Sequence, residues 1–145
     1  MELSQKYCNL RDRISSLNNE VETNIDRLNH GGCIHYARFL GYKLKRLGID
    51  CEAFLIHDEE DYTFSEIKAF GCLNVLLYIP ELGFVDSTGI HKGIPEMYQN
   101  EVIWEKNYAI STLKHFNRAY WNPTYNTSQN KLLKKLINKH INDLL

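Results

Sequence analysis

The sequence predicts a single α+β domain over 1–145, and three observations support this prediction. The length of 145 residues, 43% of them hydrophobic, suits one hydrophobic core. Apolar residues recur at helical spacing near both ends of the chain. Between these ends lie short apolar runs bounded by turn-forming residues, as in an antiparallel sheet. The order of helices, sheet and helices is typical of an α+β fold.

Two helices are predicted before the sheet. The first spans about 10–28, where apolar residues recur every three or four positions. Gly31 and Gly32 end this segment, because paired glycines favour turns over helices. The second helix is predicted from Cys33 to about position 47, with Gly48 as its C-terminal cap.

The predicted sheet consists of short strands at 51–57, 74–79 and 84–87, and 102–104 adds another. The run at 74–79 ends at a proline, and the next strand follows after the connection 80–83. Such a short connection predicts a hairpin of two antiparallel strands.

The last third of the chain is predicted to be helical and basic. A short helix is expected at 112–120, and a basic amphipathic helix capped by Thr127 or Ser128 is expected at about 127–145. Positions 111–145 hold six basic residues and one acidic residue, whereas the first 110 positions hold 11 basic and 17 acidic residues. We expect the acidic body and the basic tail to attract each other within the fold.

The composition and charge of the chain argue against some classes of binding partner. A net charge of −1 does not suit a protein that binds nucleic acid through its whole surface, so nucleic acid is not an expected partner. No apolar run reaches the length of a membrane span, and the first residues lack the pattern of a secretory leader. We therefore expect a cytoplasmic protein that has no membrane partner.

The cysteines and histidines do not form a recognisable metal site. The sequence contains no Cys-x-x-Cys pair, and the spacing His30-x-x-Cys33-x-His35 lacks an evident fourth ligand. We expect no metal and no other cofactor. The thiols are predicted to be free rather than paired, at Cys8, Cys33, Cys51 and Cys72.

Cys33 is the strongest candidate for a chemical role, because it opens the second predicted helix. Free backbone N–H groups and the helix dipole favour a thiolate at this position. Gly31 and Gly32 would let a substrate approach the backbone closely, which makes them candidate substrate-binding residues. His35 is two positions further along the helix and does not face Cys33, so a base must come from elsewhere. The alternative is a packed cysteine behind a glycine turn.

The Gly31-Gly32-Cys33 motif, followed by a helix that ends in Leu-x-x-Leu-Gly at 44–48, resembles the nucleophile helix of papain-like and transglutaminase-like cysteine hydrolases. The resemblance is greatest to the arylamine N-acetyltransferase-like branch and to small cysteine-peptidase-like proteins of phages and bacteria. It extends over about 25–90. The run 74–79 and the following Val85-Asp86-Ser87-Thr88-Gly89 resemble the two strands that carry the histidine and the aspartate of this family.

The resemblance implies a papain/transglutaminase-like fold in which Cys33 attacks a peptide, amide or ester and Asp86 is the third catalytic group. Asn74 stands where the family carries its histidine, and an amide cannot accept a proton from a thiol at neutral pH. His57 and His91 are the alternative bases, although either could be an exposed loop histidine. Asp86 could equally serve the turn that an Asp-Ser-Thr-Gly run favours.

Two functions follow from this resemblance. One is a cysteine hydrolase or acyltransferase of the peptidase or amidase type, with activity impaired at Asn74. The other is a catalytically inactive member of the fold, a pseudoenzyme that binds a protein partner, such as a host factor for a phage protein.

Overall fold

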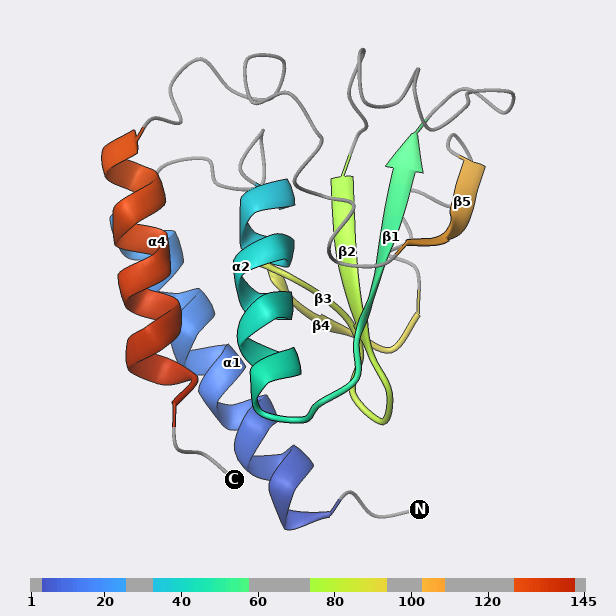
Figure 1. The fold of residues 1–145 in the computed structure, drawn as a ribbon, viewed down its shortest axis with the longest axis horizontal. Coiled ribbons are helices and arrows are strands. Elements are labelled where there is room, and N and C mark those ends of the chain that lie inside the picture. The colour runs from blue at the N-terminus through green and yellow to red at the C-terminus, as the bar shows by residue number, and fades with distance from the viewer. Residues whose placement is uncertain (1–3, 26–32, 58–73, 94–102, 109–126, 143–145) are drawn as a thin grey trace.

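The computed structural model describes residues 4–25, 33–57, 74–93, 103–108 and 127–142 (Figure 1). Within these ranges the elements are α1 (Gln5–Asn24), α2 (Cys33–Arg46), β1 (Glu52–His57), β2 (Asn74–Ile79), β3 (Gly83–Asp86), β4 (Gly89–His91), β5 (Ile103–Tyr108) and α4 (Thr127–His140). The strands form one antiparallel sheet in the order β4-β3-β2-β1-β5. The helices lie together on one side of this sheet, with α2 between the sheet and α4 (Figure 1). The architecture is α+β, as the sequence predicts.

Helix α1 begins one turn earlier than the apolar periodicity predicts. The side chain of Ser4 accepts a hydrogen bond from the backbone N–H of Tyr7 at 3.4 Å, which caps the helix before its first buried residue, Leu10. The helix ends at Asn24, where extended Ile25 caps it, and 26–28 of the predicted span lie outside the described residues. The apolar stripe therefore located the buried face of α1 correctly, whereas the cap set its first residue.

Helix α2 confirms the sequence prediction at both ends. It begins at Cys33, and Gly48 follows it with φ +79°, a left-handed conformation that glycine adopts at little cost. The backbone N–H of Gly48 donates to the carbonyl of Lys45 at 3.0 Å, and that of Ile49 donates to Leu44 at 2.9 Å. These bonds satisfy carbonyls that the end of a helix would otherwise leave without a partner.

The sheet confirms three predicted strands, β1, β2 and β3. In the β1–β2 pair, Glu52 lies opposite Tyr78 and Ile56 lies opposite Asn74. Strand β3 runs antiparallel to β2, with Leu77 opposite Val85. The end of β1, the start of β2 and the start of α2 consequently lie at the same end of the molecule (Figure 1).

Strand β4 corrects a prediction, since the sequence placed His91 in a loop and the structure places it at the end of a strand. This strand pairs with β3, with Asp86 opposite Gly89 and Phe84 opposite His91. Three residues are too few for an alternating pattern to be visible in the sequence. Gly83 permits this arrangement, since it has φ +115° and a Cβ atom there would lie 2.3 Å from the carbonyl oxygen of His91.

Strand β5 is longer than predicted. It extends from Ile103 to Tyr108 rather than over 102–104, and it pairs with β1 through a register irregularity between Phe54 and Ile56. Its middle reads Glu-Lys-Asn, which is a polar run of low β-propensity. Pairing with the edge of β1 therefore overrides local preference here. The predicted helix at 112–120 lies outside the described residues.

Helix α4 packs against both α1 and α2. Glu20 of α1 forms an ion pair with Lys139 of α4 at 2.5 Å, and Nε2 of His140 lies 3.0 Å from the same carboxylate oxygen. The hydrogen bond from Lys139 is the main cause that holds the pKa of Glu20 below its usual value. This contact is one instance of the predicted attraction between the acidic body and the basic tail. Within the described residues, no helix has both the length and the apolar character needed to cross a bilayer.

Candidate functional site

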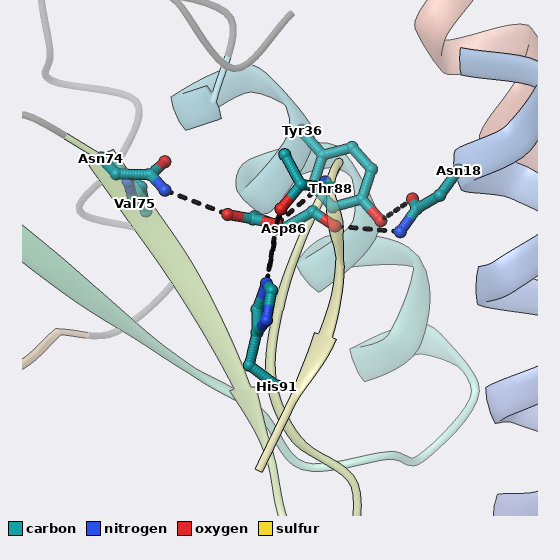
Figure 2. A network of polar contacts seen from close by, with 7 residues as sticks. All are labelled: Asn18, Tyr36, Asn74, Val75, Asp86, Thr88 and His91. Carbon is teal, nitrogen blue, oxygen red and sulfur yellow. Dashed lines mark hydrogen bonds and ion pairs between the residues drawn. The ribbon is translucent and has the colours of Figure 1, made fainter. Parts of the chain in front are cut away.

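Asp86 lies at the end of β3 in the centre of a polar cluster. It is buried, with only 2% of its surface exposed. Its Oδ2 accepts a hydrogen bond from Nδ2 of Asn74 at 3.0 Å. Its Oδ1 accepts from the backbone N–H of Thr88 at 2.9 Å and from the Thr88 hydroxyl (Figure 2). Both interpretations of Asp86 from the sequence therefore describe real contacts. One carboxylate oxygen closes the turn, and the other reaches the start of β2.

His91 is the third member of this cluster. Its Nε2 lies 3.3 Å from Oδ1 of Asp86 and 3.4 Å from Oγ1 of Thr88, and its side chain is 29% exposed. Strand β4 brings it there, because the β3–β4 hairpin folds His91 back along the strand that ends in Asp86 (Figure 2). The structure thus places His91 beside the carboxylate that Asn74 contacts, so it is not an isolated loop histidine.

Asn74 is fully buried at the first position of β2. The backbone N–H of Val75 donates to its Oδ1 at 2.8 Å, while its Nδ2 donates to Asp86. These two bonds fix which side of the amide faces the carboxylate. A histidine N–H at this position could donate to Asp86 in the same way, but the amide has no nitrogen that accepts a proton.

A second chain of buried hydrogen bonds supports Asp86 from the helical layer. The hydroxyl of Tyr36 on α2 donates to Oδ1 of Asn18 on α1 at 2.5 Å, and Nδ2 of Asn18 donates to the backbone carbonyl of Asp86 at 2.9 Å (Figure 2). Burial, followed by the negative charge of Asp86, raises the pKa of Tyr36 well above its ordinary value, and the bond to Asn18 opposes this shift. Tyr36 is therefore a neutral donor at physiological pH.

Asn18 and Tyr36 were not predicted as site residues, although the sequence contains signals for both. Asn18 lies four residues after Ile14, so the helical period places a polar side chain on the buried face of α1. Tyr36 lies three residues after Cys33 on the buried face of α2. A polar group at a buried helical position requires a hydrogen-bonding partner. The sequence does not reveal which partner.

Cys33 is the first residue of α2 and belongs to the main hydrophobic core, with 2% exposure. The predicted position at a helix start is confirmed. That end of α2 lies at the same end of the molecule as the start of β2, which carries Asn74 (Figure 1).

The remaining predicted site residues contribute less. His57 is the last residue of β1, where it pairs with Ile103, so it belongs to the strand end that adjoins the start of β2. His35 is buried in α2, with its ring centroid 6.0 Å from that of Phe39. Gly31 and Gly32 lie outside the described residues.

The described part of the chain holds no group of three or more histidine, cysteine or acidic side chains that could bind a metal ion. Cys8, Cys33 and Cys51 carry free thiols, and Cys72 lies outside the described residues. Comparisons of the chain with models of protein families, with curated proteins and with solved structures give no match. The interpretation of this site therefore depends on its own geometry and chemistry.

Proposed function

We propose that this chain is a cysteine hydrolase- or acyltransferase-like protein of the papain/transglutaminase-like superfamily, with Cys33 as nucleophile and Asn74 in the position of the base. The observation that carries the proposal is the buried hydrogen bond from Nδ2 of Asn74 to Oδ2 of Asp86. It joins the first residue of one strand to the last residue of its antiparallel neighbour. A catalytic histidine and its orienting carboxylate would need the same relation at these positions.

The proposed chemistry follows from the groups that are present and from the one that is missing. The Cys33 thiolate would attack the acyl carbon of a peptide, amide or ester, and backbone N–H groups at the start of α2 would stabilise the oxyanion. An amine leaving group needs a proton, and Asn74 cannot supply one. A phenolate leaves without protonation. We therefore expect stoichiometric acylation by activated aryl esters and little or no turnover of amides.

Replacing Asn74 with histidine tests this proposal. In Asn74→His, Asp86 would orient the new imidazole toward proton transfer with Cys33, and general-base assistance is typically worth about 10² to 10⁴ in rate. Acylation by p-nitrophenyl acetate, measured as the phenolate burst, should rise at least about tenfold over the unmodified protein. The rise should disappear in Asn74→His/Cys33→Ala, because base and nucleophile act as a unit.

His91 requires its own variant, because it already contacts Asp86. If His91 is the base, the single variant His91→Gln should acylate at Cys33 more slowly than the unmodified protein. Asn74→His should then leave the acylation rate unchanged. If Asn74 occupies the base position, His91→Gln should leave Cys33 reactivity nearly unchanged. Cys33 reactivity that changes neither in a well-folded Asn74→His protein nor in His91→Gln would contradict the hydrolase proposal.

The second candidate is a catalytically inactive member of the same fold that binds a protein partner. The way Asn74 is held favours this candidate, since both ends of its amide have partners within the protein. A buried amide fixed in this way stabilises the fold and cannot act as an acid or a base toward a thiol. In that case Cys33→Ala should leave partner binding almost unaffected. Cys33 should also label with iodoacetamide no faster than a free-cysteine peptide.

A further inference from the structure

A pocket with a volume of about 290 Å³ lies between α2 and α4, and its lining is strongly basic. Helix α2 contributes Arg38, Phe39, Lys43 and Arg46, and α4 contributes Lys134. We call these five residues the basic pocket. They share no residue with the cluster around Asp86, so the pocket is a separate feature of the helical layer.

The charges of the basic pocket are not compensated. Within the described ranges no carboxylate lines it, and none of its four cations forms an ion pair with an acidic side chain. By contrast, Lys139 on the same helix as Lys134 has its charge compensated by an ion pair with Glu20. Four like charges around one pocket repel each other, and a bound anion would relieve that repulsion.

Phe39 organises the pocket. The ammonium of Lys134 lies 4.7 Å from the centre of its ring, and the guanidinium carbon of Arg38 lies 5.5 Å from it. These cation–π contacts hold two charges from different helices beside one ring. Nε of Arg38 has no hydrogen-bond partner in the described part of the chain. Because the cations are already held in place, a ligand would lose less free energy in ordering them.

We propose that the basic pocket binds a compact polyanion, an inorganic or organic phosphate with at least two negative charges. A guanidinium fork and lysine ammonium groups are the side chains that bind phosphate oxygens best. The volume is at the small end of the range for ligand sites, which fits a short phosphate chain better than an extended polymer. This inference goes beyond the proposed function and holds whether or not Cys33 is reactive.

Inorganic triphosphate is the probe, and isothermal titration calorimetry on the full chain at low ionic strength measures its binding. Arg38→Gln and Lys134→Gln should each raise Kd about tenfold or more, since each removes a charge-assisted contact. Lys135→Gln is the matched control, because Lys135 is exposed on α4 and lies outside the pocket. It should change Kd less than about threefold, because an exposed side chain outside the pocket makes no direct contact with the ligand. Lys134→Arg should retain binding.

Three outcomes would overturn the proposal. The first is the absence of triphosphate binding, and the second is an equal loss in Lys134→Gln and Lys135→Gln, which would indicate only a diffuse positive field. The third is a single-stranded oligonucleotide that binds more tightly than triphosphate with a steeper salt dependence, which would indicate a nucleic-acid surface. Thermal melting verifies that each variant is folded. If Arg38→Gln melts early, Lys43→Gln replaces it with the same expected loss.

Discussion

The hydroxyl of Tyr36 links the helical layer to the candidate site, and its removal in Tyr36→Phe tests that link. The residue is 1% exposed, and its hydroxyl donates to Oδ1 of Asn18, whose Nδ2 in turn donates to the carbonyl of Asp86. Phenylalanine keeps the ring and the packing and deletes only the donor. Oδ1 of Asn18, in a residue 7% exposed, then has no partner in the described part of the structure.

The expected loss of stability follows from these contacts. A net intramolecular hydrogen bond contributes about 0.5–1.5 kcal/mol, and a buried acceptor left without a partner costs about 1–3 kcal/mol. We therefore expect Tyr36→Phe to lower the free energy of unfolding by about 1–3 kcal/mol. With a urea dependence of about 2 kcal/mol per molar, the midpoint should fall by roughly 0.5–1.5 M.

Urea unfolding followed by far-UV circular dichroism measures this loss, with Tyr7→Phe as the control. Tyr7 packs against the core, and its hydroxyl has no hydrogen bond in the described residues, so its replacement should change stability by less than about 0.5 kcal/mol. A double-mutant cycle with Asn18→Ala should give a coupling energy of about 1 kcal/mol or more. Equal midpoints for the two tyrosine variants, or additive losses in the cycle, would refute the reasoning.

Two further predictions concern backbone geometry and pH. In urea titrations, Gly83→Ala should destabilise the protein by at least about 2 kcal/mol more than Gly48→Ala. Both glycines have positive φ, but only at Gly83 would a Cβ atom meet backbone, at 2.3 Å from the His91 carbonyl oxygen. Equal losses would contradict the close approach of β4. Burial raises the pKa of Cys51 from 9.0 to about 11, so the folded state retains this proton at pH values where the unfolded chain loses it. The free energy of unfolding should therefore fall between pH 9 and 11, and the fall should be smaller in Cys51→Ala; identical pH profiles would rule out this contribution.

The sequence was sufficient for the features that depend on neighbouring residues. The start of α2 at Cys33 and its end before Gly48 were predicted, because helical periodicity and a left-handed cap are local signals. Short apolar runs bounded by turn residues predicted the bounds of β2 at 74–79 and placed β3 at 84–87, one residue from its observed bounds of Gly83–Asp86 at each end. Cys33 was proposed from its place at the start of a helix, whereas Asn74 and Asp86 were added to it by the resemblance to cysteine hydrolases.

Only the tertiary structure decided which polar groups meet. The contact between Asp86 and His91 depends on β4, which is too short to have a pattern and exists because Gly83 allows a close backbone approach. The bonds from Tyr36 to Asn18 and on to Asp86 join α2, α1 and β3. A buried polar side chain must find a partner, but the partner is set by how distant segments pack rather than by the residues beside it. For that reason the sequence named the residues that could react, and the packing of three elements around one carboxylate determined what each of them touches.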